Sequence, residues 1–245
     1  MERENIFICE ETQILTNKGY KKLKDVSNKE NIFNHNGKVS FIKNIKSCEK
    51  IRSLIKLEAD GILNIYLSEN IKIFIKRNID SIGEWIRIKE VPLNSYMAIP
   101  KLKEINNIYN LKIEDCWSIG TFIANKERPS NHYRKIIEKF FHNEEGTFSK
   151  EILMLPTEHL LEVISGYINS KEDSHINSDS LGLSLAIIKI HNINIPIKLK
   201  NMFYDKEYLW MPIKNISRET KKNNISISIE NIDNIILNNV LVCVK

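Results

Sequence analysis

The stretch Phe7-Ile-Cys-Glu-Glu-Thr-Gln-Ile-Leu-Thr-Asn-Lys-Gly-Tyr-Lys-Lys-Leu-Lys-Asp-Val26 decides the class of fold that we expect. Residues 12–16 favour a short β-strand, Asn-Lys-Gly at positions 17–19 favours a turn, and the apolar residues up to Val26 favour a second strand. Hairpins of this kind are common. The stretch by itself therefore predicts β structure and no particular function.

Turn residues continue to separate short apolar runs as far as about Pro100. Strong hairpin turns are expected at Asn34-His-Asn-Gly37 and at Ala59-Asp-Gly61. Residues Ile71–Ile75 alternate apolar and polar side chains with the period of two that is typical of a half-buried strand. Many short strands joined by turns predict an all-β sandwich or a strongly curved sheet.

The spacing of apolar residues changes to three and four at about Asp115, which predicts helices. One helix is expected to start at Pro156-Thr157-Glu158, where Thr157 is a suitable N-cap. The predicted helices cover residues 116–124, 133–141, 157–168 and 181–191.

β character returns after about Tyr204. The predicted strands in this part cover residues 208–213, 225–229, 235–237 and 240–242. A helical block therefore interrupts a β protein whose two halves lie at the ends of the chain. The predicted domains are residues 1–105 together with 204–245, and residues 106–203.

The composition is that of an ordinary soluble globular protein, with 42% hydrophobic and 27% charged residues. There is no run of about 18 apolar residues, and the charged N-terminus lacks the apolar segment of a secretory signal. We therefore expect an intracellular protein without a membrane partner, cytoplasmic or, in a eukaryotic or viral setting, nuclear or virus-associated. The net charge of +5 is compatible with phosphate binding but does not require it.

The cysteines and histidines are dispersed along the chain, which argues against a zinc site. Cys9, Cys48, Cys116 and Cys243 show no Cys-x-x-Cys spacing, and the six histidines do not cluster. Reduced and mostly buried thiols are expected in a cytosolic protein. We expect no cofactor from these residues.

Several short sequence motifs resemble those of inteins, which are self-splicing domains of the Hint fold. They resemble in particular an intein that carries an inserted LAGLIDADG-type homing endonuclease. Inteins open with Cys-x-x-x-x-Thr-x-Ile-Leu-Thr and a glycine-containing turn, and residues 12–23 are similar to that block. Other phrases similar to intein blocks are His35-Asn-Gly37, Asp60-Gly61, Gly83-Glu-Trp85, Tyr96-Met-Ala-Ile-Pro100, Tyr208-Leu-Trp-Met-Pro-Ile213 and residues 229–242. Residues 151–168 and 178–186 resemble the surroundings of a second LAGLIDADG helix, so the resemblance covers nearly the whole chain.

The resemblance implies an α+β protein. Both chain ends would form an all-β, horseshoe-like Hint domain, and the middle would form a LAGLIDADG-like αβ domain. An unrelated β protein with a helical insert remains the alternative.

The groups that splice a chain in inteins are missing at the matching positions. Splicing needs a Cys or Ser at the first position, a Thr-x-x-His block that assists, and a terminal His-Asn in which the Asn cyclises. The degenerate positions are Phe7, Leu67, Asn70, Cys243 and Val244. An amide cannot serve as the acid or base near neutral pH, and valine cannot cyclise. The resemblance therefore implies a chain that does not splice.

Two further residues bear on this interpretation. Cys9 could replace Phe7 as the nucleophile only if two residues had been deleted locally, and Asp233 stands where the last block has an internal histidine. The chain begins at its own Met1 and ends one residue after Val244, which leaves no flanking sequence to join.

The endonuclease acids are also replaced. LAGLIDADG helices pair through small residues, and each presents one acid to a divalent metal. The small pairs would be Gly120 with Ala124 and Gly166 with Ser170, each four residues apart on one helix face. Plain amphipathic core packing is the alternative reading for these two helices.

The metal-binding acids would fall on Asn125 and Lys171, which removes two negative charges and adds a positive one. Magnesium needs carboxylate oxygens, so two-metal cleavage is not expected. A register slip could recruit the weak candidates Glu127, Glu172 and Asp173, and magnesium would be a cofactor only in that case.

The resemblance suggests three functions. The two without catalytic activity, those of a pseudoenzyme, rank ahead of the active enzyme. The first is duplex-DNA binding without splicing or cleavage, which salt would weaken steeply. The candidate phosphate contacts are Lys126, Arg128, Arg134, Lys135, Lys171, Lys198 and Lys200, which can also be read as an ordinary solvated face. The second is a structural or protein-interaction subunit of a viral or mobile-element assembly. The third is an active homing endonuclease that uses the shifted acids.

Overall fold

The computed structural model describes residues 6–16, 19–34, 39–59, 63–100, 111–125, 141–142, 147–148, 156–170, 202–229, 233–238 and 240–244. The chain divides into two compact units. We call residues 1–100 with 201–245 the β unit and residues 101–200 the insert unit. The sequence places the same two divisions at 105/106 and 203/204.

Strands are the main elements that the structure describes in the β unit. From the N-terminal side they are β1 (Phe7–Cys9), β2 (Gln13–Thr16), β3 (Gly19–Lys22), β4 (Asn31–Phe33), β5 (Val39–Cys48), β6 (Arg52–Ala59), β7 (Ile65–Leu67), β8 (Lys72–Lys76), β9 (Glu84–Arg87) and β10 (Tyr96–Pro100). From the C-terminal side they are β13 (Phe203–Tyr204), β14 (Tyr208–Lys221), β15 (Asn224–Ile229), β16 (Asn234–Leu237) and β17 (Val240–Cys243). Single 3-10 turns, η1 (Leu23–Asp25) and η2 (Ile88–Glu90), follow β3 and β9.

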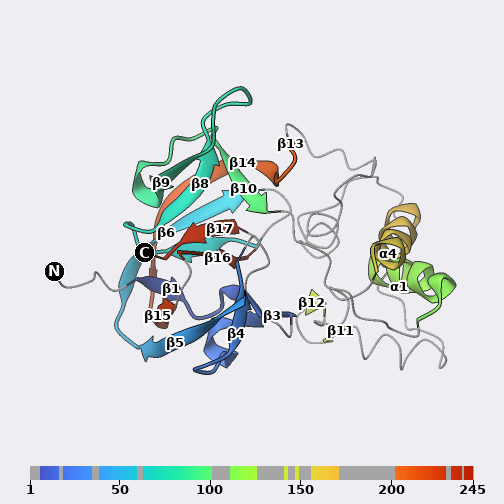
Figure 1. Cartoon of the computed structure of the whole chain (residues 1–245), viewed down its shortest axis with the longest axis horizontal. Helices are drawn as coiled ribbons and strands as arrows, with labels where there is room; N and C mark the ends of the chain where they lie inside the picture. Colours follow the sequence, from blue (N-terminus) through green and yellow to red (C-terminus); the bar gives the residue numbers. More distant parts are fainter. Residues whose placement is uncertain are drawn as a thin grey trace. The chain divides into compact units, whose positions relative to one another are not determined.

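The C-terminal strands lie between N-terminal ones. β14 separates β6 from β10, β15 separates β1 from β5, and β16 and β17 lie between β2 and β8. Figure 1 shows the same arrangement, with the orange and red strands running among the blue and cyan ones. Every described strand pair is antiparallel. Both ends of the chain therefore contribute to one sheet.

Alternating apolar and polar residues along a strand place the apolar side chains on the buried face of this sheet. In β8, Ile73 and Ile75 are fully buried while Lys72 is exposed. In β10, by contrast, the consecutive residues Met97, Ala98 and Ile99 are all buried, which happens when both faces of a strand are covered. Removing this apolar surface from water is the main driving force for the β unit.

An aromatic cluster around Trp210 joins strands from both halves of the chain. Trp210, Ala98 and Leu241 are buried, and the partly buried rings that pack against them are Phe74, Tyr96, Phe203 and Tyr208. The ring centroids of Tyr96 and Phe203 are 4.9 Å apart, in the edge-on arrangement that aromatic pairs prefer. The cluster lies where β10 leaves the β unit and β13 returns to it.

Two helices pair in the insert unit, α1 (Ile113–Asn125) and α4 (Thr157–Asn169). They approach closely at Gly166, where an added Cβ would lie 2.0 Å from the carbonyl oxygen of Trp117. The hydroxyl of Thr121 also donates a hydrogen bond to the carbonyl oxygen of Gly166 at 3.4 Å. Gly166 therefore lets the two helix backbones meet.

The helix starting at Thr157 and the helix over 116–124 are found as predicted. Most of the predicted helix 133–141 and all of 181–191 lie outside the described residues. Phe141 itself belongs to a two-stranded ribbon, β11 (Phe141–His142) with β12 (Thr147–Phe148), because it pairs with Phe148 instead of continuing a helix. Two helices and a ribbon do not establish a LAGLIDADG domain. No helix in the described parts of the chain is long and apolar enough to cross a membrane.

Candidate functional site

The turn between β7 and β8 holds the start of the first strand. The backbone N–H of Ser68 donates to the carbonyl oxygen of Phe7 at 2.9 Å, and the N–H of Phe7 donates to the hydroxyl oxygen of Ser68 at 3.2 Å. The N–H of Ile71 closes the turn on the carbonyl oxygen of Ser68 at 3.1 Å. Both backbone hydrogen-bonding groups of Phe7 are thus held by one residue.

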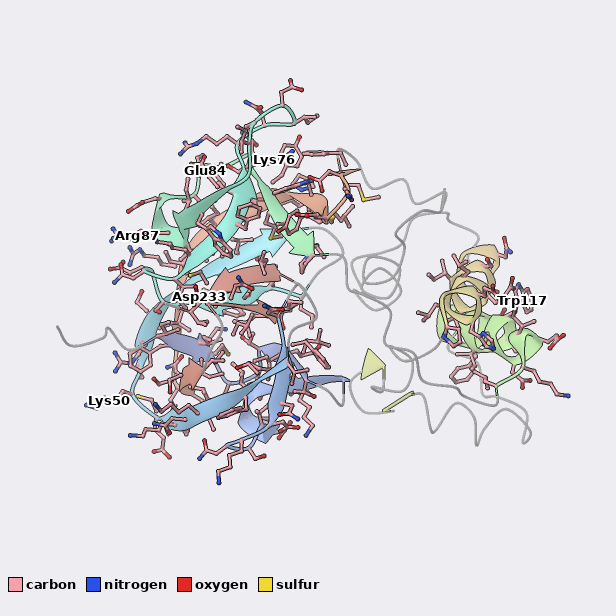
Figure 2. All side chains as sticks on the ribbon, viewed as in Figure 1. Lys50, Lys76, Glu84, Arg87, Trp117 and Asp233 are labelled. Atoms are coloured by element: carbon pink, nitrogen blue, oxygen red, sulfur yellow. The ribbon has the colours of Figure 1, made fainter. Side chains whose placement is uncertain are left out.

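The last strand reaches the other side of the same turn. Cys243 of β17 pairs with Lys72 of β8, the second residue after Asn70. The N–H of Val244 donates to the carbonyl oxygen of Asp233 at 2.8 Å, so β17 is also held against the start of β16. Asp233 is labelled in Figure 2. The first and last strands of the chain therefore meet around residues 68–72.

The side chains at this meeting point do not include a nucleophile at the expected place. Phe7 presents a ring, Leu67 is fully buried, Asn70 is exposed, and Val244 is aliphatic. Cys9 lies two residues further along β1, opposite Asn224, and is 9% exposed. Because Phe7 and not Cys9 contacts the turn, the structure gives no support to a shift of two residues.

The contact of Ser68 with Phe7 is not predicted from the sequence. Alignment with the Thr-x-x-His block assigns the hydroxyl-bearing position to Leu67, whereas the hydroxyl that binds Phe7 belongs to the next residue. The presence of one serine in Leu67-Ser-Glu-Asn70 is the only signal that could have pointed to it. Its hydroxyl accepts a hydrogen bond from a backbone N–H, and this is a positioning contact.

The carboxylate of Glu69 in this turn is paired with an arginine. The guanidinium of Arg218 donates to the carboxylate of Glu69 at 2.9 Å, and both side chains are exposed. An exposed pair of this kind contributes little to stability. Within the described residues, no group of three or more His, Cys, Asp or Glu side chains is arranged to hold a metal ion.

Most of the candidate residues in the insert unit lie outside the part of the chain that the structure describes. Asn125 is the last residue of α1. The other candidates of that unit lie outside the described residues: Lys126, Glu127, Arg128, Arg134, Lys135, Lys171, Glu172, Asp173, Lys198 and Lys200. Their roles in DNA or metal binding stay predictions.

No protein-family model matches this chain, and no curated protein matches it. Among solved structures it is similar to a DnaB intein from Synechocystis sp. PCC 6803, at 10% identity and a TM-score of 0.45, with 98% of this chain and 99% of that chain covered. A mutant of an Ssp DnaB mini-intein variant gives 13% identity and a TM-score of 0.46, with coverages of 98% and 99%. The intein-like domain from Clostridium thermocellum gives 8% identity and a TM-score of 0.44, with 98% of this chain and 99% of that chain covered. These neighbours are inteins or intein-like domains, and at TM-scores below 0.5 the similarity carries no conclusion about activity.

Proposed function

We propose that the β unit is an intein-like Hint domain that has kept the meeting of its first and last strands and has lost the groups that splice. The observation that carries this proposal is the position of Phe7 and Cys243 on either side of one turn. Phe7 exchanges two hydrogen bonds with Ser68, and Cys243 pairs with Lys72. Neither the ring of Phe7 nor the side chain of Val244 can attack or cyclise onto a carbonyl carbon. The β unit then acts as a scaffold.

The test places residues 7–244 between two reporter domains. We expect the unchanged chain to give intact precursor by mass spectrometry. In a second version, Phe7→Cys with Asn70→His puts a thiol and an imidazole at the positions where inteins carry them. That version should release the N-terminal reporter when a small thiol is added, because a thioester forms at the junction.

Two outcomes would count against the proposal. Spliced product from the unchanged sequence would show that the reactive groups lie elsewhere. A folded Phe7→Cys, Asn70→His version that never responds to thiol would show that this turn is not a splicing centre. Cys9→Ser in the same background is the matched control, and it should leave the thiol response unchanged because Cys9 lies away from the turn.

We infer a second function for the insert unit, the binding of duplex DNA without cleavage. The close contact of α1 and α4 at Gly166 supports this, since LAGLIDADG helices pair through small residues. Lys126 and Arg128 directly follow α1 in the sequence and add positive charge there. Lys171 adds another where that family has an acid.

A gel-shift titration of the whole protein at increasing salt tests this function. We expect affinity to fall steeply with salt, since binding releases counterions from the phosphates. Lys126→Glu with Arg128→Glu should weaken binding, while Lys222→Glu, an exposed change in the β unit, should not. Absence of binding, or binding that salt does not change, would overturn the inference.

Two further results would redirect the assignment. Cutting of DNA with Mg²⁺ or Mn²⁺, abolished by Asp173→Asn, would support an active endonuclease instead. A fixed protein partner that copurifies without nucleic acid would support the structural or interaction subunit.

A further inference from the structure

The thiol of Cys48 lies at the end of β5, beside the turn that leads into β6. Cys48 is partly exposed, and Lys50, in that turn, is labelled at the rim of the β unit in Figure 2. The backbone N–H of Lys50 bonds the sulfur, and a guanidinium nitrogen of Arg52 lies 4.0 Å from it. The hydrogen bond from Lys50 is the main reason that the pKa of Cys48 lies below its usual value, and the Arg52 charge adds to the effect.

Phe7 holds Arg52 in this position. The guanidinium carbon lies 3.5 Å from the centroid of the Phe7 ring, a short cation–π contact. The contact keeps the planar fork of Arg52 next to the sulfur and not free in solvent. Phe7 thus positions the cation that Cys48 faces.

Asn224 lies directly opposite Cys48 in the antiparallel pair of β15 and β5. Residues directly opposite in such a pair have their Cβ atoms about 5 Å apart on one face of the sheet. Asn224 is 0% exposed, and its amide nitrogen donates to the carbonyl oxygen of Lys50 at 3.1 Å. The same nitrogen donates to the carbonyl oxygen of Lys221 at 3.0 Å, so the side chain ties the turn after β5 to the turn before β15.

Two buried side-chain atoms of Asn224 and Arg52, the residues that neighbour Cys48, have no hydrogen-bond partner among the described residues. They are the Oδ1 acceptor of Asn224 and the Nε donor of Arg52. A buried polar atom without a partner is unfavourable. One is an acceptor and the other a donor, so a hydroxyl group within reach of both would satisfy both.

We propose that Cys48 is a site of oxidation by hydrogen peroxide or an organic hydroperoxide, with Arg52 and Asn224 receiving the product. The thiolate sulfur attacks one peroxide oxygen, an S–O bond forms and the O–O bond breaks. The sulfur is oxidised by two electrons, the peroxide is reduced, and the leaving hydroxide or alkoxide takes up, through solvent, the proton that the thiol released when it became a thiolate. The sulfenic acid oxygen accepts from the Nε–H of Arg52, and its O–H donates to Oδ1 of Asn224.

The other cysteines are internal references. Cys116 is fully buried, and burial raises the pKa of its thiol to about 12. Cys9 is also buried, whereas Cys243 is partly exposed like Cys48. Cys243 is therefore the matched comparison for the effect of Arg52 and the Lys50 N–H.

The experiment uses the reduced full chain. It is treated with hydrogen peroxide, trapped with a cyclic 1,3-dione that reacts with sulfenic acids, and mapped by peptide mass spectrometry. In parallel, the rate of iodoacetamide labelling is measured for each cysteine between pH 5 and 9. We expect Cys48 to carry most of the trapped adduct and to be alkylated at least about threefold faster than Cys243 at pH 7, because thiolates are the reactive species.

Variants separate the contributions of charge and stacking. Arg52→Met should move the labelling profile of Cys48 to higher pH and reduce its trapping several-fold. Phe7→Leu should do the same to a smaller extent, and Arg52→Lys should keep part of the effect. Equal reactivity of Cys48 and Cys243 in the unchanged protein would overturn the proposal, as would a profile that Arg52→Met and Arg52→Lys both leave unchanged while circular dichroism shows a folded chain.

Discussion

At the scale of single residues, Asn238 joins three distant parts of the β unit. It lies between β16 and β17 with a φ of 44°, a left-handed conformation that asparagine tolerates better than most residues. Its Oδ1 accepts from the N–H of Gln13 at 2.8 Å, and its Nδ2 donates to the carbonyl oxygen of Asn64 at 2.9 Å. The side chain is 4% exposed.

Asn238→Ala should therefore lower the free energy of unfolding by about 1–3 kcal/mol, because it removes both hydrogen bonds and leaves a non-glycine residue at positive φ. Urea unfolding followed by circular dichroism measures the change. Asn238→Gly restores the freedom at φ and should be the milder of the two changes. Equal loss in both variants would assign the whole effect to the hydrogen bonds, and no loss in either would contradict the role of Asn238.

Asp205 is the polar residue beneath the aromatic cluster. Burial raises the pKa of its carboxyl group, but hydrogen bonds from the indole of Trp210 and the N–H groups of Glu207 and Tyr208 outweigh burial, so the pKa is lowered overall. The bond from the indole nitrogen of Trp210 to Oδ2 is 2.7 Å long. Asp205 thus satisfies the buried indole N–H.

A lowered pKa means that Asp205 stabilises the folded state above its unfolded pKa of about 4, and that this stabilisation is lost as pH falls below it. We expect the thermal midpoint to drop between pH 5 and pH 3, and Asp205→Asn to show a smaller drop. Asp80→Asn, at an exposed residue of the β8–β9 turn, is the matched control and should keep the dependence of the unchanged chain. Identical curves for Asp205→Asn and the unchanged chain would contradict this reading.

At the scale of elements, pairing and not local pattern decides how long the strands are. The apolar residues that follow the turn at Asn34–Gly37 end at Ile42, yet β5 continues to Cys48 because residues 42–48 pair with β15. β14 likewise extends beyond Ile213 to Lys221 along β6, although its last residues are mostly polar. A partner strand supplies the hydrogen bonds that make these polar segments extended.

The helix pair depends on the missing side chain of Gly166. Gly166→Ala should stabilise an isolated helix by about 1 kcal/mol, but here its Cβ would lie 2.0 Å from a backbone oxygen of Trp117 and would force the helices apart. We therefore expect faster amide hydrogen exchange in α1 and α4, with the β unit unchanged. Ser165→Ala on the same helix is the control. Slower exchange in Gly166→Ala would show that the two helices do not meet there.

At the scale of the whole molecule, the insert unit leaves and re-enters the β unit at nearby strands. Ile99 of β10 and Tyr204 of β13 both pair with Leu209 of β14, one on each side. Two strand spacings amount to about 10 Å. A short flexible linker is long enough to join these ends.

Replacing residues 101–201 by about six Gly and Ser residues should therefore give a chain that still folds, since a linker of that length spans such a gap. We expect a β-type circular dichroism spectrum, one cooperative unfolding transition and the fluorescence of a buried Trp210. A chain that aggregates or unfolds without cooperativity would show that the β unit needs its insert. The same deletion in the Asn238→Ala background should be less stable still.

The amino-acid sequence by itself determined the class of most elements. Alternation and turn residues predicted a mostly β protein with helices in the middle. The run Pro156-Thr157-Glu158 marked a helix start correctly, but Thr157 is the first residue of α4 and Pro156, whose carbonyl oxygen accepts from the N–H of Leu160, is its N-cap. Such features follow from local backbone preferences and from the spacing of apolar side chains, which neighbouring residues are enough to set. The replaced residues at Phe7, Asn70 and Val244 were also visible in the sequence.

Tertiary structure alone decided which distant segments meet. The contact of Phe7 with Ser68, the stacking of Arg52 on Phe7 and the position of Asn224 opposite Cys48 join residues far apart in the chain. They depend on strand order and register, and a shift of one residue would turn every side chain of a strand to the other face. The local sequence pattern does not specify that register, because the register is set by the packing of both chain ends into one sheet.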